Sequence, residues 1–222
     1  MDQTSHSLWA AGASGDLELI KQLIKEGADV NYVNGDGRSA LMRSAKRGFR
    51  DVVEYLLSMG ADPNLVDKNN KNALMGAAKK GHLDICKLLV DAGCDINVSD
   101  NNGRTALMRA AFLGQLNVVA YLLSKGVDVN AQDNMGRSAL MEACVAYRLE
   151  CVKELVNNGA DVNAQDNNGC SALMRASYLG YVELVNFLLE HGADKELLDN
   201  SGQKAIHYVR QENLDQLKDI LK

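Results

Sequence analysis

Proline is almost absent from this chain, with Pro63 the only one among 222 residues, and aromatic residues make up only 5%. Because proline breaks helices, its scarcity favours a helical protein, and so few aromatics suit helices separated by small side chains. The sequence has no run of about 20 apolar residues, so no membrane span is expected. Its opening stretch, MDQTSHSLWAAGASG, lacks the basic segment and the long apolar core of a secretory signal.

A disulfide framework is also missing. The five cysteines are odd in number and lie at unrelated spacings: Cys86, Cys94, Cys144, Cys151 and Cys170. This usage indicates reduced thiols in an intracellular protein, so we expect a cytoplasmic location. A secreted form that had been processed at its N-terminus would show the same residues.

The motifs of common active sites and metal sites do not occur. The sequence has no G-x-x-x-x-G-K-[ST] phosphate loop and no G-x-S-x-G elbow. Its four histidines neither pair at i, i+4 nor accompany a cysteine pair: His6, His82, His191 and His207. We therefore expect no enzyme, with no catalytic residues, no metal or other cofactor and no small-molecule substrate. The formal net charge of −5 gives no overall attraction to nucleic acid or anionic lipid.

What the sequence does contain is a unit repeated every 33 residues. The template is the stretch 100–132, DNNGRTALMRAAFLGQLNVVAYLLSKGVDVNAQ, whose Gly126 recurs as Gly27, Gly60, Gly93, Gly159 and Gly192. Its Ala-Leu-Met tripeptide recurs in the same register, with Ala205-Ile206-His207 as a divergent copy. A fixed period of this length predicts a stack of small structural units that contact mainly their neighbours.

One unit specifies two short helices and a loop. Asp100 belongs to a turn, and Thr105 stands where the N-cap of a helix is expected. Gly114 and Gly126 end the first and second helices as a glycine beyond a helix C-terminus does. The predicted buried faces follow helical spacing, with Leu107, Ala110 and Ala111 in the first helix and Leu116, Val119, Leu122 and Leu123 in the second.

The pattern D-x-x-G-x-T-x-L-x-x-A-A-x-x-G-x-x-x-V-V-x-L-L-x-x-G-A-D-V-N resembles the ankyrin repeat over residues 5–222. The resemblance implies an all-α fold, an ankyrin-repeat α-solenoid of helix-turn-helix units joined by β-hairpin-like loops. We expect a single ankyrin repeat domain over residues 1–222. Its repeats are an N-terminal cap at about 5–33, five repeats at 34–66, 67–99, 100–132, 133–165 and 166–198, and a C-terminal cap at 199–222.

One departure from the family pattern is systematic. Where the family usually has T-P-L-H, this sequence has S/T/N-A-L-M, so methionines replace the histidine: Met42, Met75, Met108, Met141 and Met174. The family's histidine hydrogen bonds between repeats should therefore be missing, apart from those of His207. We predict that the methionines pack in the core, rather than forming a row of soft ligands or an adaptable groove. Cys86, Cys144 and Cys151 are predicted to be small core residues as well.

Two turns depart from the template. Asn70 stands where glycine is usual, and because asparagine tolerates the left-handed region this turn should survive. Tyr147 replaces the glycine between two helices. Because a tyrosine held at positive φ costs about 1–3 kcal/mol, we expect this turn to relax into another shape.

The first helix of each unit has a variable face opposite its buried one. In order it comprises Arg43, Lys46 and Arg47, then Gly76, Lys79 and Lys80, then Arg109, Phe112 and Leu113, then Glu142, Val145 and Ala146, then Arg175, Tyr178 and Leu179. The family resemblance implies that this face and the hairpin tips line a concave groove that binds partners. The predicted partner-binding residues are Arg38, Arg43, Lys46, Arg47, Lys68, Lys71, Lys79, Lys80, Arg104, Arg109, Phe112, Leu113, Met135, Arg137, Val145, Tyr178 and Leu179.

This groove has a basic stretch in the second and third units and apolar residues in the fourth to sixth. Exposed apolar residues with aromatics and arginines are typical of binding surfaces. We expect a scaffold or interaction module that takes an extended or helical protein segment, with acidic residues of the partner toward the lysines. In the simpler interpretation, the apolar side chains pack on one another or on the hairpins and the lysines are solvated.

Two alternatives stay open. The protein could inhibit an enzyme or act as its adaptor, which is a special case of protein binding. The basic stretch could instead bind nucleic acid or an anionic membrane surface, although the acidic total and the lack of aromatics among those lysines disfavour this. Polar caps at both ends argue against end-to-end stacking, so a monomer is expected.

Overall fold

The computed structural model describes residues 3–222, and this part of the chain is helical and contains no β-strand. The all-α class predicted from the repeat is confirmed. The helices are short because each unit has only 33 residues for two helices and a loop. The chain divides into two compact units, Met1–Ala106 and Leu107–Lys222.

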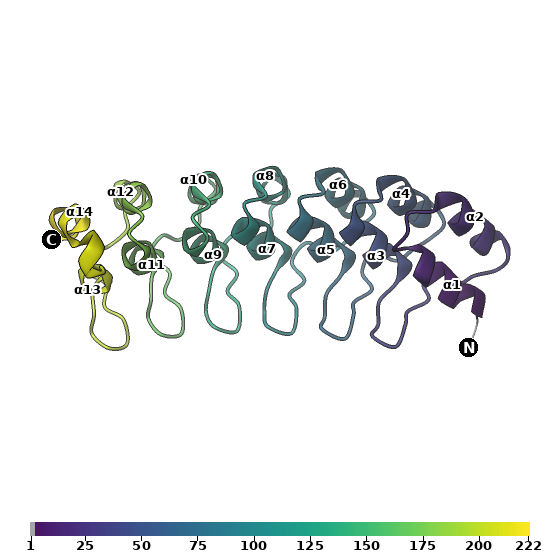
Figure 1. Ribbon diagram of the computed structural model, residues 1–222, viewed down its shortest axis with the longest axis horizontal. Helices are drawn as coiled ribbons and strands as arrows, with labels where there is room; N and C mark the ends of the chain where they lie inside the picture. Colours follow the sequence, from purple (N-terminus) through teal and green to yellow (C-terminus); the bar gives the residue numbers. More distant parts are fainter. Residues whose placement is uncertain (1–2) are drawn as a thin grey trace. The chain divides into compact units, whose positions relative to one another are not determined.

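Unit 1 contains three helix pairs. They are α1 (Gln3–Ala11) with α2 (Leu17–Lys25), α3 (Ala40–Arg47) with α4 (Arg50–Ser58), and α5 (Ala73–Lys80) with α6 (Leu83–Asp91). The first helices α1, α3 and α5 pack on one another, and so do the second helices α2, α4 and α6. In Figure 1 the two sets form two rows, and the loops extend from the row of first helices on the side away from the second helices.

Unit 2 repeats this arrangement. Its helices are α7 (Ala106–Leu113), α8 (Leu116–Ser124), α9 (Ala139–Val145), α10 (Leu149–Asn157), α11 (Ala172–Leu179), α12 (Val182–Glu190), α13 (Ala205–Tyr208), a 3₁₀ turn at Gln211–Asn213 and α14 (Leu214–Leu221). The first helices α9, α11 and α13 are neighbours, as are the second helices α8 and α10 (Figure 1). The last pair is the shortest, since α13 has only one turn.

The predicted helix starts are confirmed at four first helices. The side-chain oxygen of Ser39 accepts a hydrogen bond from the backbone N–H of Met42 at 3.3 Å, which satisfies one of the N–H groups that the first turn leaves unpaired. Asn72, Ser138 and Ser171 cap α5, α9 and α11 in the same way.

The core of each unit follows the predicted periodicity. All five repeated methionines are buried, with exposed fractions between 1% and 8%, so their assignment to the core is confirmed. Cys86, Cys144 and Cys151 are buried as predicted, and the cysteines are free. Burial raises the pKa of the Cys86 and Cys144 thiols to about 12, so both are neutral at physiological pH.

The loops are held by the repeated aspartates. The Oδ1 atom of Asp133 accepts from the backbone N–H groups of Met135 and Arg137, at 2.9 and 3.0 Å. Asp62 plays the predicted part in its own turn, accepting from the N–H of Asn64 at 2.8 Å. Four isolated antiparallel bridges, among them Gln132 to Ser138, give the loops their hairpin character. The aspartates therefore replace backbone partners that such short turns lack.

Successive repeats are joined by an asparagine ladder, made of Asn31 and Asn64 in unit 1 and of Asn130 and Asn163 in unit 2. Each side chain donates to a backbone carbonyl and accepts from a backbone N–H of the next repeat. For Asn163 these are the carbonyl of Gly192 at 2.9 Å and the N–H of Asp194 at 2.8 Å. The ladder therefore links the loops of successive repeats through side-chain hydrogen bonds. His207 accepts from the N–H of Lys204, in its own repeat, at 3.0 Å.

The predictions for the two unusual turns had different outcomes. Asn70 adopts φ 58°, so its turn survives as predicted. The expectation for Tyr147 is wrong, because the turn keeps its shape and Tyr147 stays at φ 49°. The N–H of Arg148 still reaches the carbonyl of Ala143 at 2.9 Å, as the N–H of Gln115 reaches Ala110 in the preceding turn. The ring of Tyr147 stacks against that of Tyr181, with ring centroids 4.4 Å apart. Helix α9 ends at Val145, before this turn.

Replacing Asn163 with alanine tests the ladder. The change removes two hydrogen bonds and leaves a backbone carbonyl and an N–H without partners, so the free energy of unfolding should fall by about 2 kcal/mol. Asn157→Ala is the matched control because Asn157 is exposed at the end of α10, and it should change the free energy by less than about 0.5 kcal/mol. Urea unfolding followed by circular dichroism measures both. Equal losses in the two variants would contradict a structural role for the ladder.

Candidate partner-binding surfaces

In unit 1 four cationic side chains extend from the last turns of the neighbouring helices α3 and α5. This basic row consists of Lys46, Arg47, Lys79 and Lys80, and all four are exposed. Within residues 3–222, Lys46, Arg47 and Lys80 make no ion pair with a carboxylate. Cations at helix C-termini also stabilise the helix dipole, typically by about 0.3–1 kcal/mol each, so part of their role is local.

Gly76 allows Lys46 of α3 to lie close to helix α5. A Cβ atom at Gly76 would lie 3.2 Å from the Cβ of Lys46, closer than most such contacts. Other first helices carry a long side chain in this register, such as Arg43. The glycine in α5 therefore leaves room for Lys46 to lie against that helix.

Arg43 lies beside the basic row and is half-buried. Its guanidinium stacks over the Trp9 ring, 4.0 Å from the ring centroid, and its Nη1 donates to the Trp9 carbonyl oxygen at 3.1 Å. Burial lowers the pKa of Arg43, and repulsion from Arg47 and Arg38 lowers it further. The charges of Arg38 and Arg47 are therefore close enough to repel that of Arg43.

The loops of unit 1 add the other predicted basic residues. Arg38 is exposed and lies 3.8 Å from the carboxylate of Asp36 and 3.6 Å from that of Asp67, so its charge is partly neutralised. Lys68 is exposed, whereas Lys71 and Arg104 are half-buried. The helix ends therefore carry more accessible positive charge than the loops do.

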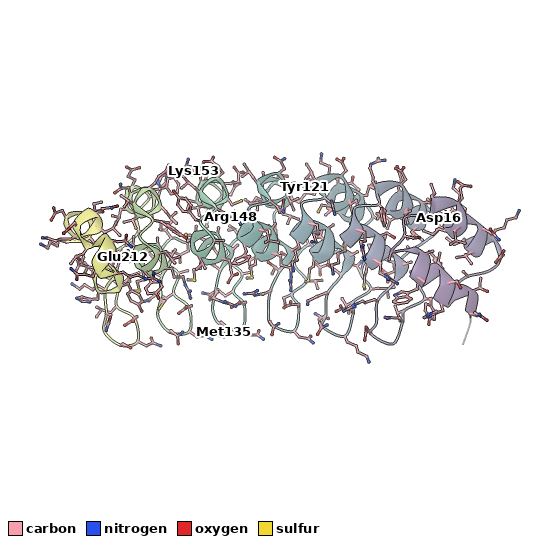
Figure 2. The ribbon with its side chains drawn as sticks, viewed as in Figure 1. Asp16, Tyr121, Met135, Arg148, Lys153 and Glu212 are labelled. Carbon is pink, nitrogen blue, oxygen red and sulfur yellow. The ribbon has the colours of Figure 1, made fainter. Side chains whose placement is uncertain are left out.

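In unit 2 the same register is apolar. Phe112, Val145 and Tyr178 occupy equivalent positions in the last turns of α7, α9 and α11, and their exposed fractions are 41%, 37% and 46%. These three residues form the apolar row. Leu113 and Leu179 beside it are half-buried. Met135 is exposed at the tip of the loop before α9, as Figure 2 shows.

Tyr178 has a neighbour that the repeat pattern did not predict. The guanidinium of Arg210 lies over its ring, 4.2 Å from the centroid. The contact covers one face of the ring and leaves the residue nearly half exposed, so it orients the tyrosine without burying it. Arg210 belongs to the divergent last unit, where the template has no equivalent.

A buried ionic cluster lies under this surface of unit 2. Glu142 was expected on the variable face with its neighbours, but it is only 6% exposed, so that expectation is wrong. Nη1 of Arg137 lies 3.3 Å from Oε1 of Glu142, and Nη2 lies 2.7 Å from Oδ2 of Asp133. These carboxylates hold the predicted site residue Arg137, which is half-buried. Hydrogen bonding to Asp133 raises the pKa of Arg137.

The remaining predicted arginine of this unit, Arg109, is half-buried in α7. Arg175, in the same register of α11, donates from Nη2 to the buried carboxylate of Asp166. Arg109, Arg137 and Arg175 are therefore less accessible than the apolar row. No cluster of three potential metal ligands occurs among the described residues. None of the helices in residues 3–222 has the length and apolar character that a membrane span requires.

The family model for ankyrin repeats (three copies) matches residues 7–100, 51–133 and 127–199, so the chain belongs to the ankyrin repeat family. Ankyrin repeat domains are in general protein–protein interaction modules. Among solved structures, the ankyrin repeat domain of Bcl-3, described as a unique member of the IkappaB protein family, is 28% identical with a TM-score of 0.83. That match covers 96% of this chain and 97% of the other.

The human ASB11 ankyrin repeat domain is 24% identical, with a TM-score of 0.87 and 97% of each chain covered. This second likeness shows a shared fold. No curated protein matches the sequence. The comparisons therefore identify the architecture and the general class of interaction module.

Acidification tests the buried cluster. Burial opposes ionisation of Asp133, but hydrogen bonds from the Arg137 side chain and from backbone N–H groups outweigh it and lower the pKa of Asp133. Below about pH 4 the unfolded chain then binds more protons than the folded one, so the free energy of unfolding decreases as the pH falls. Asp133→Asn keeps an acceptor oxygen but removes the charge. It should be less stable than wild type at pH 6 and less sensitive to pH below 4.

Urea unfolding between about pH 6 and pH 3 measures this difference. Asp91→Asn is the control, because Asp91 is exposed on α6 and makes no ion pair within the described residues. It should leave the pH dependence of wild type unchanged. A variant at Asp133 with the same steep dependence as wild type would show that the ionised carboxylate does not stabilise the fold.

Proposed function

We propose that this protein is an interaction module or scaffold that binds partner proteins through the first-helix face and loop tips of its repeats. The observation that carries the proposal is the apolar row of unit 2. Phe112, Val145 and Tyr178 share one register in three successive repeats and stay between 37% and 46% exposed. A repeated register normally has a repeated structural role, yet these side chains are not needed to close the core.

The apolar row suits the anchor residues of a protein segment. Aromatic side chains bury a large area on binding and lose few rotamers, which makes them frequent centres of binding energy. The half-buried Leu113 and Leu179 would then lie at the margin of the contact. The exposed Met135 supplies an adaptable side chain at the loop tip.

The basic row of unit 1 suits acidic residues of a partner. Lys46, Arg47 and Lys80 have no carboxylate partner within residues 3–222, and Arg47 and Arg38 add cations that repel Arg43. Arg38, Lys68 and Lys71 add further positive charges along the loops. An acidic protein segment is favoured over nucleic acid because the exposed aromatic residues needed to stack bases are not among these lysines.

Two functional classes share this mode of binding. A scaffold joins two proteins, whereas an inhibitor or adaptor places its surface against an enzyme. Both rest on the same residues, so we propose a binding function and infer no catalytic one. Identifying the captured protein would distinguish the two classes.

Replacing the two aromatics of the apolar row tests this function. In affinity capture from lysate of the source cell, the Phe112→Ser, Tyr178→Ser variant should lose a protein that wild type retains, because two anchor residues are removed. Met59→Ser is the matched control, since Met59 is 44% exposed beyond the end of α4 in unit 1. It should retain the partner. Capture of the same proteins by all three forms, each folded to the same extent, would contradict the proposed surface.

Reversing charge in the basic row tests the partner's chemistry. Lys79→Glu with Lys80→Glu should weaken binding of the captured protein by about tenfold or more and reduce its salt dependence, because two attractive contacts become repulsive. Lys25→Glu with Lys87→Glu makes the same change of net charge on the second helices and should leave the affinity near that of wild type. Titrations at two salt concentrations measure both effects. Retained affinity in the first variant would contradict an acidic partner segment.

A further inference from the structure

The backbone at Tyr147 is the most unusual feature of the fold. In the five other turns between α1 and α12 that join the two helices of a repeat, the equivalent position is held by glycine at positive φ: Gly15, Gly48, Gly81, Gly114 and Gly180. Tyr147 has φ 49° at this position, and a bulky residue there is strained where glycine is not. Strained residues of this kind are concentrated at functional sites, so Tyr147 is a position at which to look for one.

The surroundings of Tyr147 differ from those of the glycines. At Gly48, the ring of His82 from the next repeat lies 2.7 Å from where a Cβ would be, so the following side chain fills the space. At Tyr147, the ring of Tyr181 from the next repeat stacks instead, with ring centroids 4.4 Å apart and planes at 36°. Tyr147 remains 41% exposed. The turn therefore presents an aromatic pair on the surface of unit 2, in place of a closed glycine turn.

A carboxylate completes this group. The hydroxyl of Tyr147 donates to Oε2 of Glu183 at 3.2 Å, and Glu183 is exposed near the start of α12. Partial burial, and then the bond to Glu183, raises the pKa of Tyr147, so the phenol stays a neutral donor at physiological pH. Tyr147, Tyr181 and Glu183 are called the tyrosine pair site below. Its ring faces carry a negative electrostatic potential and its carboxylate a negative charge, so the site is complementary to a cation.

The cations of the chain near this site, Arg148 and Lys153, already have hydrogen-bond partners. Nε of Arg148 donates to the carbonyl oxygen of Phe112 at 3.2 Å. Nζ of Lys153 lies 2.8 Å from Oε1 of Glu150, and the charges of Glu150 and Glu183 both favour its protonated form. Figure 2 labels both residues on the helix pair α9 and α10. The same protein stacks arginine on aromatic rings elsewhere, as Arg210 does over Tyr178 at 4.2 Å.

We propose that the tyrosine pair site binds an arginine side chain in a basic segment of a partner protein. The planar guanidinium can stack on the ring of Tyr147 while its N–H groups donate to Glu183, and arginine suits this arrangement better than lysine because of its fixed planar fork. The site lies at an interhelical turn and uses none of the residues of the apolar row. It is independent of the function proposed above.

A labelled tetra-arginine peptide with blocked ends is the probe, and its fluorescence anisotropy reports binding. Tyr147→Asn and Glu183→Gln should each weaken the affinity by about fivefold, since each removes one part of the site. Asparagine tolerates positive φ, as Asn70 shows in this chain, so the turn is kept. Glu190→Gln removes the same charge from the other end of α12 and should bind the peptide as wild type does. A peptide with citrulline in place of arginine should bind at least fivefold more weakly.

Three results would overturn the proposal. An equal loss with Glu190→Gln would mean that the peptide responds only to the net negative charge of the protein. Equal affinity for the citrulline peptide would exclude a cation site. Unchanged affinity in Tyr147→Asn, with circular dichroism and urea unfolding showing an intact fold, would leave the tyrosine without a part in binding. Tyr147→Gly, which restores the residue found in the other turns, should behave as Tyr147→Asn does.

Discussion

The hydrogen bonds of the asparagine ladder set the geometry on which the other features depend. A single helix pair of this length has too little apolar surface to fold alone, so its neighbours must be placed at a fixed distance and in a fixed register. In each rung, one amide bridges a carbonyl and an N–H of the next repeat, as Asn64 does with Gly93 and Asp95. Because these bonds join asparagine side chains to backbone groups in the loops, they do not depend on which side chains lie on the variable face of the first helices.

This separation of structure from surface explains how one fold presents different chemistry along its length. Leu41, Leu74 and Met75 are buried in nearly the same way in their repeats, whereas the residue near the end of each first helix changes. That register is lysine in α3 and α5, and it is phenylalanine or tyrosine in α7 and α11. Substitutions there change the chemistry of the surface at little structural cost, because the fold leaves these positions free.

Much of the fold could be predicted from the sequence, because the period, the caps and the buried methionines are local or repeated features. The failures involve contacts specific to one unit. Glu142 is buried because Arg137 reaches it from the preceding loop, and the sequence signal was an acid in a register otherwise held by arginine or glycine. Tyr147 keeps a positive φ in a turn where its ring stacks against Tyr181, a residue of the next repeat. Likewise, the cover that Arg210 gives to Tyr178 comes from a divergent unit, where the pattern has no predictive value.

Each unit contains buried thiols whose reactivity depends on local opening of that unit. Cys86 and Cys94 lie in unit 1, and Cys144 and Cys151 in unit 2, and burial raises the pKa of all four thiols. A neutral, enclosed thiol reacts with an alkylating reagent only after the surrounding helices separate, because the reagent needs both access and the thiolate. The rates at which the two pairs are alkylated therefore report how often each half of the repeat array opens while the other half stays folded.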